Sequence, residues 1–168
     1  MAFLPHLKII IIQKQMVRTF ASDYEIGKEG ERMSFPALKE FFGDDLKWSD
    51  DIFAPWDFTS SSVVLEQKTR TISSKKHPTT LMNLLKVMRA VQEPRPAFFI
   101  FRFTDGLYYI KHNADKFSQY QLLPMTVKGR DVVDKEDWRY YIPIEDLTLL
   151  QALQPQDCQH CQVALFAQ

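Results

Sequence analysis

Residues 57–69, with the sequence DFTSSSVVLEQKT, decide the fold that we predict for this chain. The middle of this stretch, 59–62, is short and polar and is typical of a tight turn. It separates an extended stretch that ends at 56–58 from an apolar run that begins at Val63 and ends at Thr69. The pattern therefore predicts two or three short strands joined by tight turns.

Helical patterns lie on both sides of these strands. Ser22 and Glu25 have the spacing of a capping box, so a helix is expected to begin here. Pro36 is expected to break or kink it, and a short second piece should stop at Gly43. A further helix is predicted over 79–92. Its apolar residues form one stripe, from whose centre Lys86 and Arg89 point away: Leu81, Leu84, Leu85, Met88 and Val91.

The second half of the chain adds more strands. Residues 97–103 and 107–112 flank Thr104-Asp105-Gly106, which predicts a β-hairpin because Asp-Gly tolerates the positive φ of a tight turn. Another strand is expected over 138–144, followed by a short helix over 145–153. Together these elements predict an α/β domain with a mixed β-sheet flanked by helices.

The composition is that of one soluble globular domain. The chain has 168 residues, 45% of them hydrophobic, and its 21 basic and 21 acidic side chains leave no net formal charge. We expect a domain over 22–153, a poorly specified leader over 1–21 and a tail over 154–168. No apolar run is long enough to cross a membrane. Cys158 and Cys161 form no disulfide framework, which indicates an intracellular setting, cytoplasmic or nuclear.

The chemistry of the chain is expected at Asp57, Glu66 and Lys68. Glu66 and Lys68 are two residues apart on a predicted strand, so both should point to the same face, next to Asp57 on the neighbouring strand. Two carboxylates in apolar surroundings are costly unless a cation lies between them. Mg²⁺ is a hard cation that takes such oxygen ligands, and the backbone carbonyl of Gln67 is a further candidate ligand.

Simpler explanations of the same residues stay open. A Glu-x-Lys pattern on a strand is most often a solvated face or a cross-strand ion pair. Asp57 follows Pro55 closely and is also typical of a turn. The tail residues Cys158 and Cys161 have half the spacing of a zinc site and lack a second pair of ligands.

The chain resembles the PD-(D/E)XK nuclease superfamily, which has the restriction-endonuclease-like fold and includes Holliday-junction resolvases. Asp57 matches the aspartate of the motif, and Glu66-Gln67-Lys68 matches its Glu-x-Lys. Glu31 matches the acid often found on the first helix, although Glu25 and Glu29 compete with it. The proline of the motif is displaced by one position, to Pro55-Trp56-Asp57. The resemblance implies a core in the order α-β-β-β-α-β.

The resemblance also implies an activity, namely metal-dependent hydrolysis of phosphodiester bonds by a DNA endonuclease. It implies that Asp57, Glu66, Gln67 and Glu31 hold Mg²⁺ or Mn²⁺. Lys68 is then expected to orient the attacking water and to offset the charge that develops on the phosphate. Many members of the family are dimers, so a homodimer is one expected assembly.

A basic loop follows the motif and is the expected contact with nucleic acid. Its cations, together with one from the next helix, are Arg70, Lys75, Lys76, His77 and Lys86. Phosphates are held by such side chains, by hydroxyl groups and by helix N-termini. DNA is the expected partner and RNA the alternative, while an exposed loop without a partner is the simpler explanation.

Two alternative functions are also consistent with the sequence. One is a non-catalytic nucleic-acid-binding module of the same fold, and the other is a protein-interaction domain that uses its aromatic surface, since the chain has 13 phenylalanines. The sequence contains no phosphate-binding loop of the GxxxxGK[ST] type, no GxGxxG and no GxSxG. It therefore gives no support to a P-loop NTPase, a dinucleotide enzyme or an α/β-hydrolase.

Overall fold

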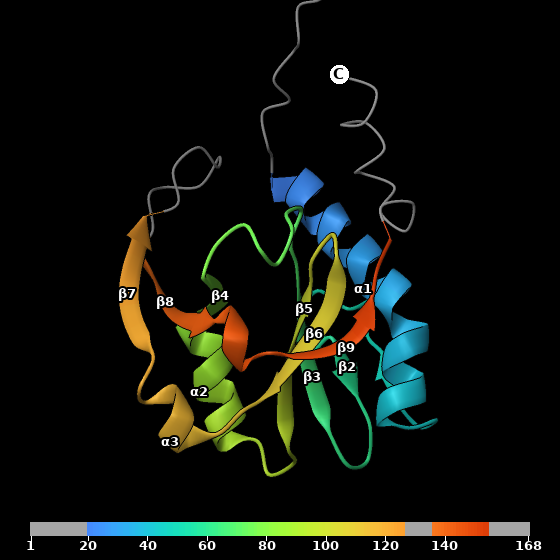
Figure 1. Ribbon diagram of the computed structural model, residues 1–168. Helices are drawn as coiled ribbons and strands as arrows, with labels where there is room; N and C mark the ends of the chain where they lie inside the picture. The colour runs from blue at the N-terminus through green and yellow to red at the C-terminus, as the bar shows by residue number, and fades with distance from the viewer. Residues whose placement is uncertain (1–19, 127–135, 155–168) are drawn as a thin grey trace, which may run out of the picture.

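The computed structural model describes residues 20–126 and 136–154, which form an α/β protein with two sheets and few helices (Figure 1). The predicted leader lies almost wholly outside the described residues, and Cys158 and Cys161 lie outside them as well.

The larger sheet is mixed and has six strands in the order β1-β2-β3-β5-β6-β9. Its strands are β1 (Lys47–Trp48), β2 (Phe58–Thr59), β3 (Val64–Thr69), β5 (Ala97–Arg102), β6 (Gly106–Lys111) and β9 (Thr148–Ala152). Strands β3 and β5 are parallel, and every other neighbouring pair is antiparallel. A parallel pair needs a crossover, and helix α2 (Leu84–Gln92) lies in the segment that connects them.

The smaller sheet is antiparallel, in the order β4-β8-β7. It consists of β4 (Thr79–Asn83), β8 (Glu136–Pro143) and β7 (Gln121–Thr126), with the short helix α3 (Ala114–Phe117) before β7. The strand predicted over 138–144 is confirmed by β8. The helix predicted over 145–153 is wrong: one 3₁₀ turn (Ile144–Asp146) leads into β9, because the edge of β6 offers backbone partners to the chain there.

The helix predicted over 79–92 is only half correct. Residues Thr79–Asn83 form β4, which pairs with β8 more than fifty residues later in the chain. Helix α2 begins at Leu84, after an N-cap at which the side chain of Asn83 accepts a hydrogen bond from the amide of Leu85.

Three apolar residues of the predicted stripe face outward on α2, although such a stripe usually faces the core. Leu85, Met88 and Val91 are 69%, 50% and 63% exposed, whereas Val87 and Ala90 are buried against the sheets. The buried side of α2 is therefore set by where the helix lies over the sheet, and not by which side of the helix carries more apolar residues.

Helix α1 (Phe20–Phe42) is continuous through Pro36, so the chain does not break there, and the short second piece expected before Gly43 is part of the same helix. Pro36 is on the exposed side, and Phe35 and Leu38 pack against the sheet on the other side. This packing outweighs the hydrogen bond that the proline removes. The helix ends as predicted at Gly43, whose φ of 122° suits glycine.

Two apolar cores lie on opposite faces of the large sheet. One packs under α1 and includes Leu38, Phe58 and Leu65. The other lies between the sheet and the layer formed by α2 and the small sheet, and it includes Val64 and Phe101. Because neighbouring strand residues point to opposite faces, Val64, Glu66 and Lys68 face α2, whereas Leu65 and Gln67 face α1.

The hairpin predicted around 104–106 is confirmed as β5 and β6. Its turn does not use a positive φ at Gly106, since Gly43 alone has one among the described residues. None of the helices in 20–126 and 136–154 is both long and apolar enough to cross a membrane.

The close approach of α1 to β3 gives a first prediction. A Cβ added to Gly30 would lie 2.1 Å from Oγ1 of Thr69, whereas one added to Gly27 meets nothing within 4 Å. We therefore expect Gly30→Ala to lower the free energy of unfolding by about 1–3 kcal/mol, as overpacking does. Gly27→Ala should raise it by about 0.5–1 kcal/mol, because alanine favours a helix. Urea denaturation of both variants tests this, and equal effects would contradict the tight contact.

Candidate functional site

Glu66 is the buried centre of the site. It lies in the middle of β3 and is 1% exposed. Its Oε1 lies 2.7 Å from the Nζ of Lys68, and its Oε2 lies 2.7 Å from the Nζ of Lys86. A carboxylate removed from water needs such partners, and here each oxygen has one. The strand places Lys68 on the same face as Glu66, as the sequence predicted, and α2 brings Lys86 over that face.

Asp57 lies next to this ion-pair network, immediately before β2. The register that pairs Phe58 with Leu65 places Asp57 beside Glu66 on the neighbouring strand. Its Oδ2 accepts a hydrogen bond of 2.7 Å from the backbone N–H of Gln67. Burial, followed by the charges of Glu66 and Glu31, raises the pKa of Asp57 to about 7; Lys68 and this hydrogen bond offset part of the effect.

Lys68 stays cationic in this environment. Burial alone would lower its pKa, but the carboxylates of Glu66 and Asp57 outweigh burial, so the pKa of Lys68 is raised above its usual value. The ammonium group is therefore a fixed positive charge beside two acids at neutral pH.

Glu31 approaches the site from α1. It is 7% exposed, and its Oε2 accepts hydrogen bonds from the Nζ of Lys28 at 3.0 Å and the indole N–H of Trp48 at 2.9 Å. Of the three acids that competed for this place, Glu25 is exposed and Glu29 pairs with Arg32, so Glu31 is the one near Asp57.

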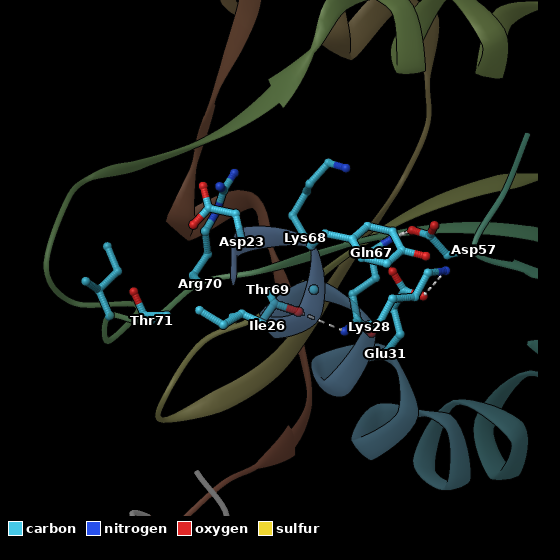
Figure 2. A pocket seen from close by; sticks show the side chains of 13 residues that line it. Asp23, Ile26, Lys28, Glu31, Asp57, Gln67, Lys68, Thr69, Arg70 and Thr71 are labelled. Atoms are coloured by element: carbon cyan, nitrogen blue, oxygen red, sulfur yellow. Dashed lines mark hydrogen bonds and ion pairs between the residues drawn. The ribbon is translucent and has the colours of Figure 1, made fainter. Parts of the chain in front are cut away.

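A pocket of about 490 Å³ opens between the first turns of α1 and the end of β3. Figure 2 shows Lys28, Glu31 and Asp57 gathered at one end of it, with Gln67 beside Asp57. Lys68 and Arg70 also line the pocket, so it is continuous with the face on which Lys68 meets Glu66.

Asp57 is the carboxylate of this site that suits a metal ion. Lys68 and Lys86 pair with Glu66, and Lys28 pairs with Glu31, but within the described residues no lysine or arginine forms an ion pair with Asp57. Burial and the charges of Glu66 and Glu31 disfavour the ionised form of Asp57 and raise its pKa, so a cation beside it would stabilise that form. The carbonyl of Gln67 leaves the strand on the same side as the N–H that binds Asp57.

These donors fit a hard divalent cation in part. Carboxylate and carbonyl oxygens are what Mg²⁺ prefers, and Mg²⁺ often binds through one or two carboxylates, waters and phosphate oxygens. In 20–126 and 136–154 no group of three or more His, Cys, Asp or Glu side chains is arranged as a ready metal centre. A metal would therefore depend on Asp57, on Glu66 after it exchanges a lysine, and on oxygens from solvent or substrate.

The basic loop after β3 is partly fixed. Its residues Ser73 and Ser74 donate to the carboxylate of Asp105 at 2.7–2.8 Å, so the β5–β6 turn holds the loop in place. Lys75, Lys76 and His77 are exposed beyond this anchor. The helix N-terminus expected to follow the loop is absent at that position, because the loop leads into β4.

Arg70 is tied to the fold rather than extended into solvent. Its guanidinium donates to Oγ1 of Thr80 at 3.3 Å and to the carbonyl of Leu81. Burial and the nearby charge of Arg139 lower the pKa of Arg70 to about 10. Arg70 is still charged at neutral pH, and its two acceptors here are uncharged.

Sequence reasoning missed some members of this site. The ion pair of Lys86 with Glu66 was not expected, and Lys28 and Trp48 were not singled out. Lys28 lies three residues before Glu31 on a helix, a spacing that signals an ion pair. No such local signal links Trp48 or Lys86 to the site.

Comparisons with protein-family models, curated proteins and solved structures find no match to this chain.

The pKa of Asp57 gives a second prediction. Because its pKa is about 7 in the folded protein and close to 3.8 when unfolded, folding takes up a proton between these values, and stability falls as the pH rises through this window. Asp57→Asn should remove this pH-dependent loss of stability, because asparagine does not ionise. In metal-free buffer we expect the variant to gain up to about 4 kcal/mol at pH 8 and almost nothing below pH 4.

Thermal or urea denaturation at both pH values measures this difference, with the exposed Asp44→Asn as a control that should change little. A gain of the same size at both pH values would contradict the shifted pKa.

Proposed function

We propose that this protein is a metal-dependent nuclease that hydrolyses phosphodiester bonds, with DNA as its substrate and Mg²⁺ or Mn²⁺ as its cofactor. The observation that carries the proposal is the placement of Asp57 beside Glu66 across a β-hairpin, with Lys68 charged on the same face. This is the arrangement implied by the resemblance to the PD-(D/E)XK nucleases.

The order of elements supports the same proposal. Helix α1, the antiparallel run β1-β2-β3, the crossover helix α2 and the parallel strand β5 follow the α-β-β-β-α-β order of a restriction-endonuclease-like core. Strand β4 lies between β3 and α2 in the chain but belongs to the other sheet, so the order holds for the strands of the large sheet.

In the proposed mechanism, Asp57, Glu66 and the carbonyl of Gln67 would hold the metal, which when bound would supply an activated water and polarise the phosphate. Lys68 stays protonated, so it orients the water and stabilises the negative charge that develops on the phosphate, and it does not act as a base. Lys86 is a positioning residue, because it fixes Glu66 from α2. Glu31 is held by Lys28 and Trp48 close enough to Asp57 to affect its charge.

The cations around the site suit a polyanion. Arg70 is charged, half-buried and bound to neutral acceptors, and it lines the pocket, which leaves its charge available to a phosphate. Lys75, Lys76 and His77 are exposed on an anchored loop, as expected of side chains that track a nucleic-acid backbone.

One observation favours a second candidate, a nucleic-acid-binding module without turnover. Both carboxylate oxygens of Glu66 are occupied by lysine ammonium groups, and a metal must displace at least one of them. If the ion pairs are too strong for this exchange, the site binds phosphate and does not cut.

A cleavage assay tests the nuclease proposal. Purified protein should cut DNA only with Mg²⁺ or Mn²⁺, and Asp57→Asn, Glu66→Gln and Lys68→Ala should each lower the rate by at least about 10²- to 10³-fold, as loss of one preorganised electrostatic group does. Matched changes at exposed residues, Asp44→Asn, Glu40→Gln and Lys111→Ala, should leave the rate unchanged.

The substrates should include duplex, flap, junction and single-stranded DNA, and RNA. Cutting that persists in EDTA or in the Glu66 and Lys68 variants would place the activity elsewhere. Binding to these substrates without any cutting would favour the non-catalytic module.

The basic loop gives a separate prediction about binding. Each phosphate contact contributes about −0.9 to the slope of log affinity against log salt on duplex DNA. The double variant Lys75→Ala/Lys76→Ala should therefore flatten the slope by about 2 units, because both side chains are exposed on the loop. Lys47→Ala/Lys111→Ala removes the same charge from other exposed positions and should leave the slope unchanged. Equal slopes for both double variants would exclude this loop as the contact.

A further inference from the structure

The pocket beside α1 contains a polar group that the proposed hydrolysis does not use. Gln67 is 4% exposed and points to the α1 face, away from Lys68. Its Nε2 reaches Oγ1 of Thr69 at 3.4 Å, but its Oε1 has no hydrogen-bond partner among the described residues. Buried amide oxygens are normally bonded, so an orphaned one indicates a missing water or ligand donor.

An aromatic ring lies in the same pocket. Tyr24 lines it from the first turns of α1, and the Nζ of Lys28 lies 6.0 Å from the centre of its ring. Gly27, between them on the helix, leaves open space where a side chain would stand. The pocket therefore offers a ring face, free volume and a hydrogen-bond acceptor.

The pocket is also continuous with the proposed site of hydrolysis, because Asp57 and Lys68 line it. A ligand in it would lie next to a phosphodiester bound at those residues. A base has a flat face for an aromatic ring and, in every standard nucleotide, an N–H donor for an acceptor such as Gln67 Oε1.

We propose that this pocket holds one unstacked nucleobase of the bound nucleic acid, with Tyr24 against its face and Gln67 accepting from its N–H. The inference rests on the proposed function and narrows its substrate to nucleic acid with an unpaired or easily extruded base. Extrusion from a duplex costs free energy, which is least for a base that has no pairing partner.

Binding of three labelled DNA duplexes to the full-length chain in Ca²⁺ tests the proposal. One duplex is fully paired, the second carries a single bulged adenine, and the third carries an abasic site at the bulge. We expect the bulged adenine to bind about tenfold more tightly than the other two, the order of effect that one stacked base has. Gln67→Leu and Tyr24→Ala should each remove this preference.

Two matched controls keep the readout specific. Gln92→Leu changes an exposed glutamine on α2, and Tyr24→Phe keeps the ring, so both should retain the preference for the bulged adenine. Tyr24→Ala also tests the pocket if Gln67→Leu does not fold.

Other outcomes overturn the proposal. Equal binding of the three duplexes would refute the proposal, and so would a preference that survives both Gln67→Leu and Tyr24→Ala. In either case the donor to Gln67 Oε1 would be water and not a base. Displacement by free deoxyadenosine monophosphate, with no preference among the duplexes, would assign the pocket to a free nucleotide. Cutting of paired DNA without any preference would leave the nuclease proposal intact and refute this one. Absence of binding to all three duplexes would refute this proposal, and the cleavage assay on the other substrates would decide the nuclease proposal separately.

Discussion

The buried carboxylate of Glu66 is the interaction on which the rest of this structure depends. It lies in the central part of a sheet with apolar cores on both faces, at a position where an unpaired charge would be very costly. Two ammonium groups offset the cost of burying this charge: that of Lys68 on the same strand and that of Lys86 on α2. The charge of the site and the docking of the crossover helix are therefore linked through one side chain.

The two neighbouring carboxylates are treated differently by the fold. Glu66 has a cation at each oxygen, whereas Asp57 has a backbone amide and two acids close by. One of them, Glu66, holds two lysines in position through its ion pairs. The other has a pKa near neutrality, so its charge responds to its surroundings. Acids with strongly shifted pKa values, such as Asp57, are more frequent in functional sites than elsewhere in proteins.

The part of the site that could be predicted from sequence is the part that is local. Strand alternation alone placed Glu66 and Lys68 together, and helix phase selected Glu31 over Glu25 and Glu29 as the acid near Asp57. Both follow from fixed periodicities of 2 and 3.6 residues.

The errors arose where distant segments decide the structure. Residues 79–83 form a strand because β8 pairs with them, and α1 continues through Pro36 because the sheet packs beneath it. Neither partner is visible in the local sequence. Lys86 belongs to the site for the same reason, since only the crossover brings it to Glu66.

The link between α2 and β3 also constrains the order in which the chain assembles. Strands β3 and β5 are parallel and about thirty residues apart in sequence, so their pairing is a late, non-local event in folding. Until α2 packs, Glu66 lacks the ammonium of Lys86, and burying it in the sheet would be unfavourable. The central pair of strands, the crossover helix and the charge network are thus expected to form in one cooperative step, and a partly formed sheet without α2 has little stability of its own.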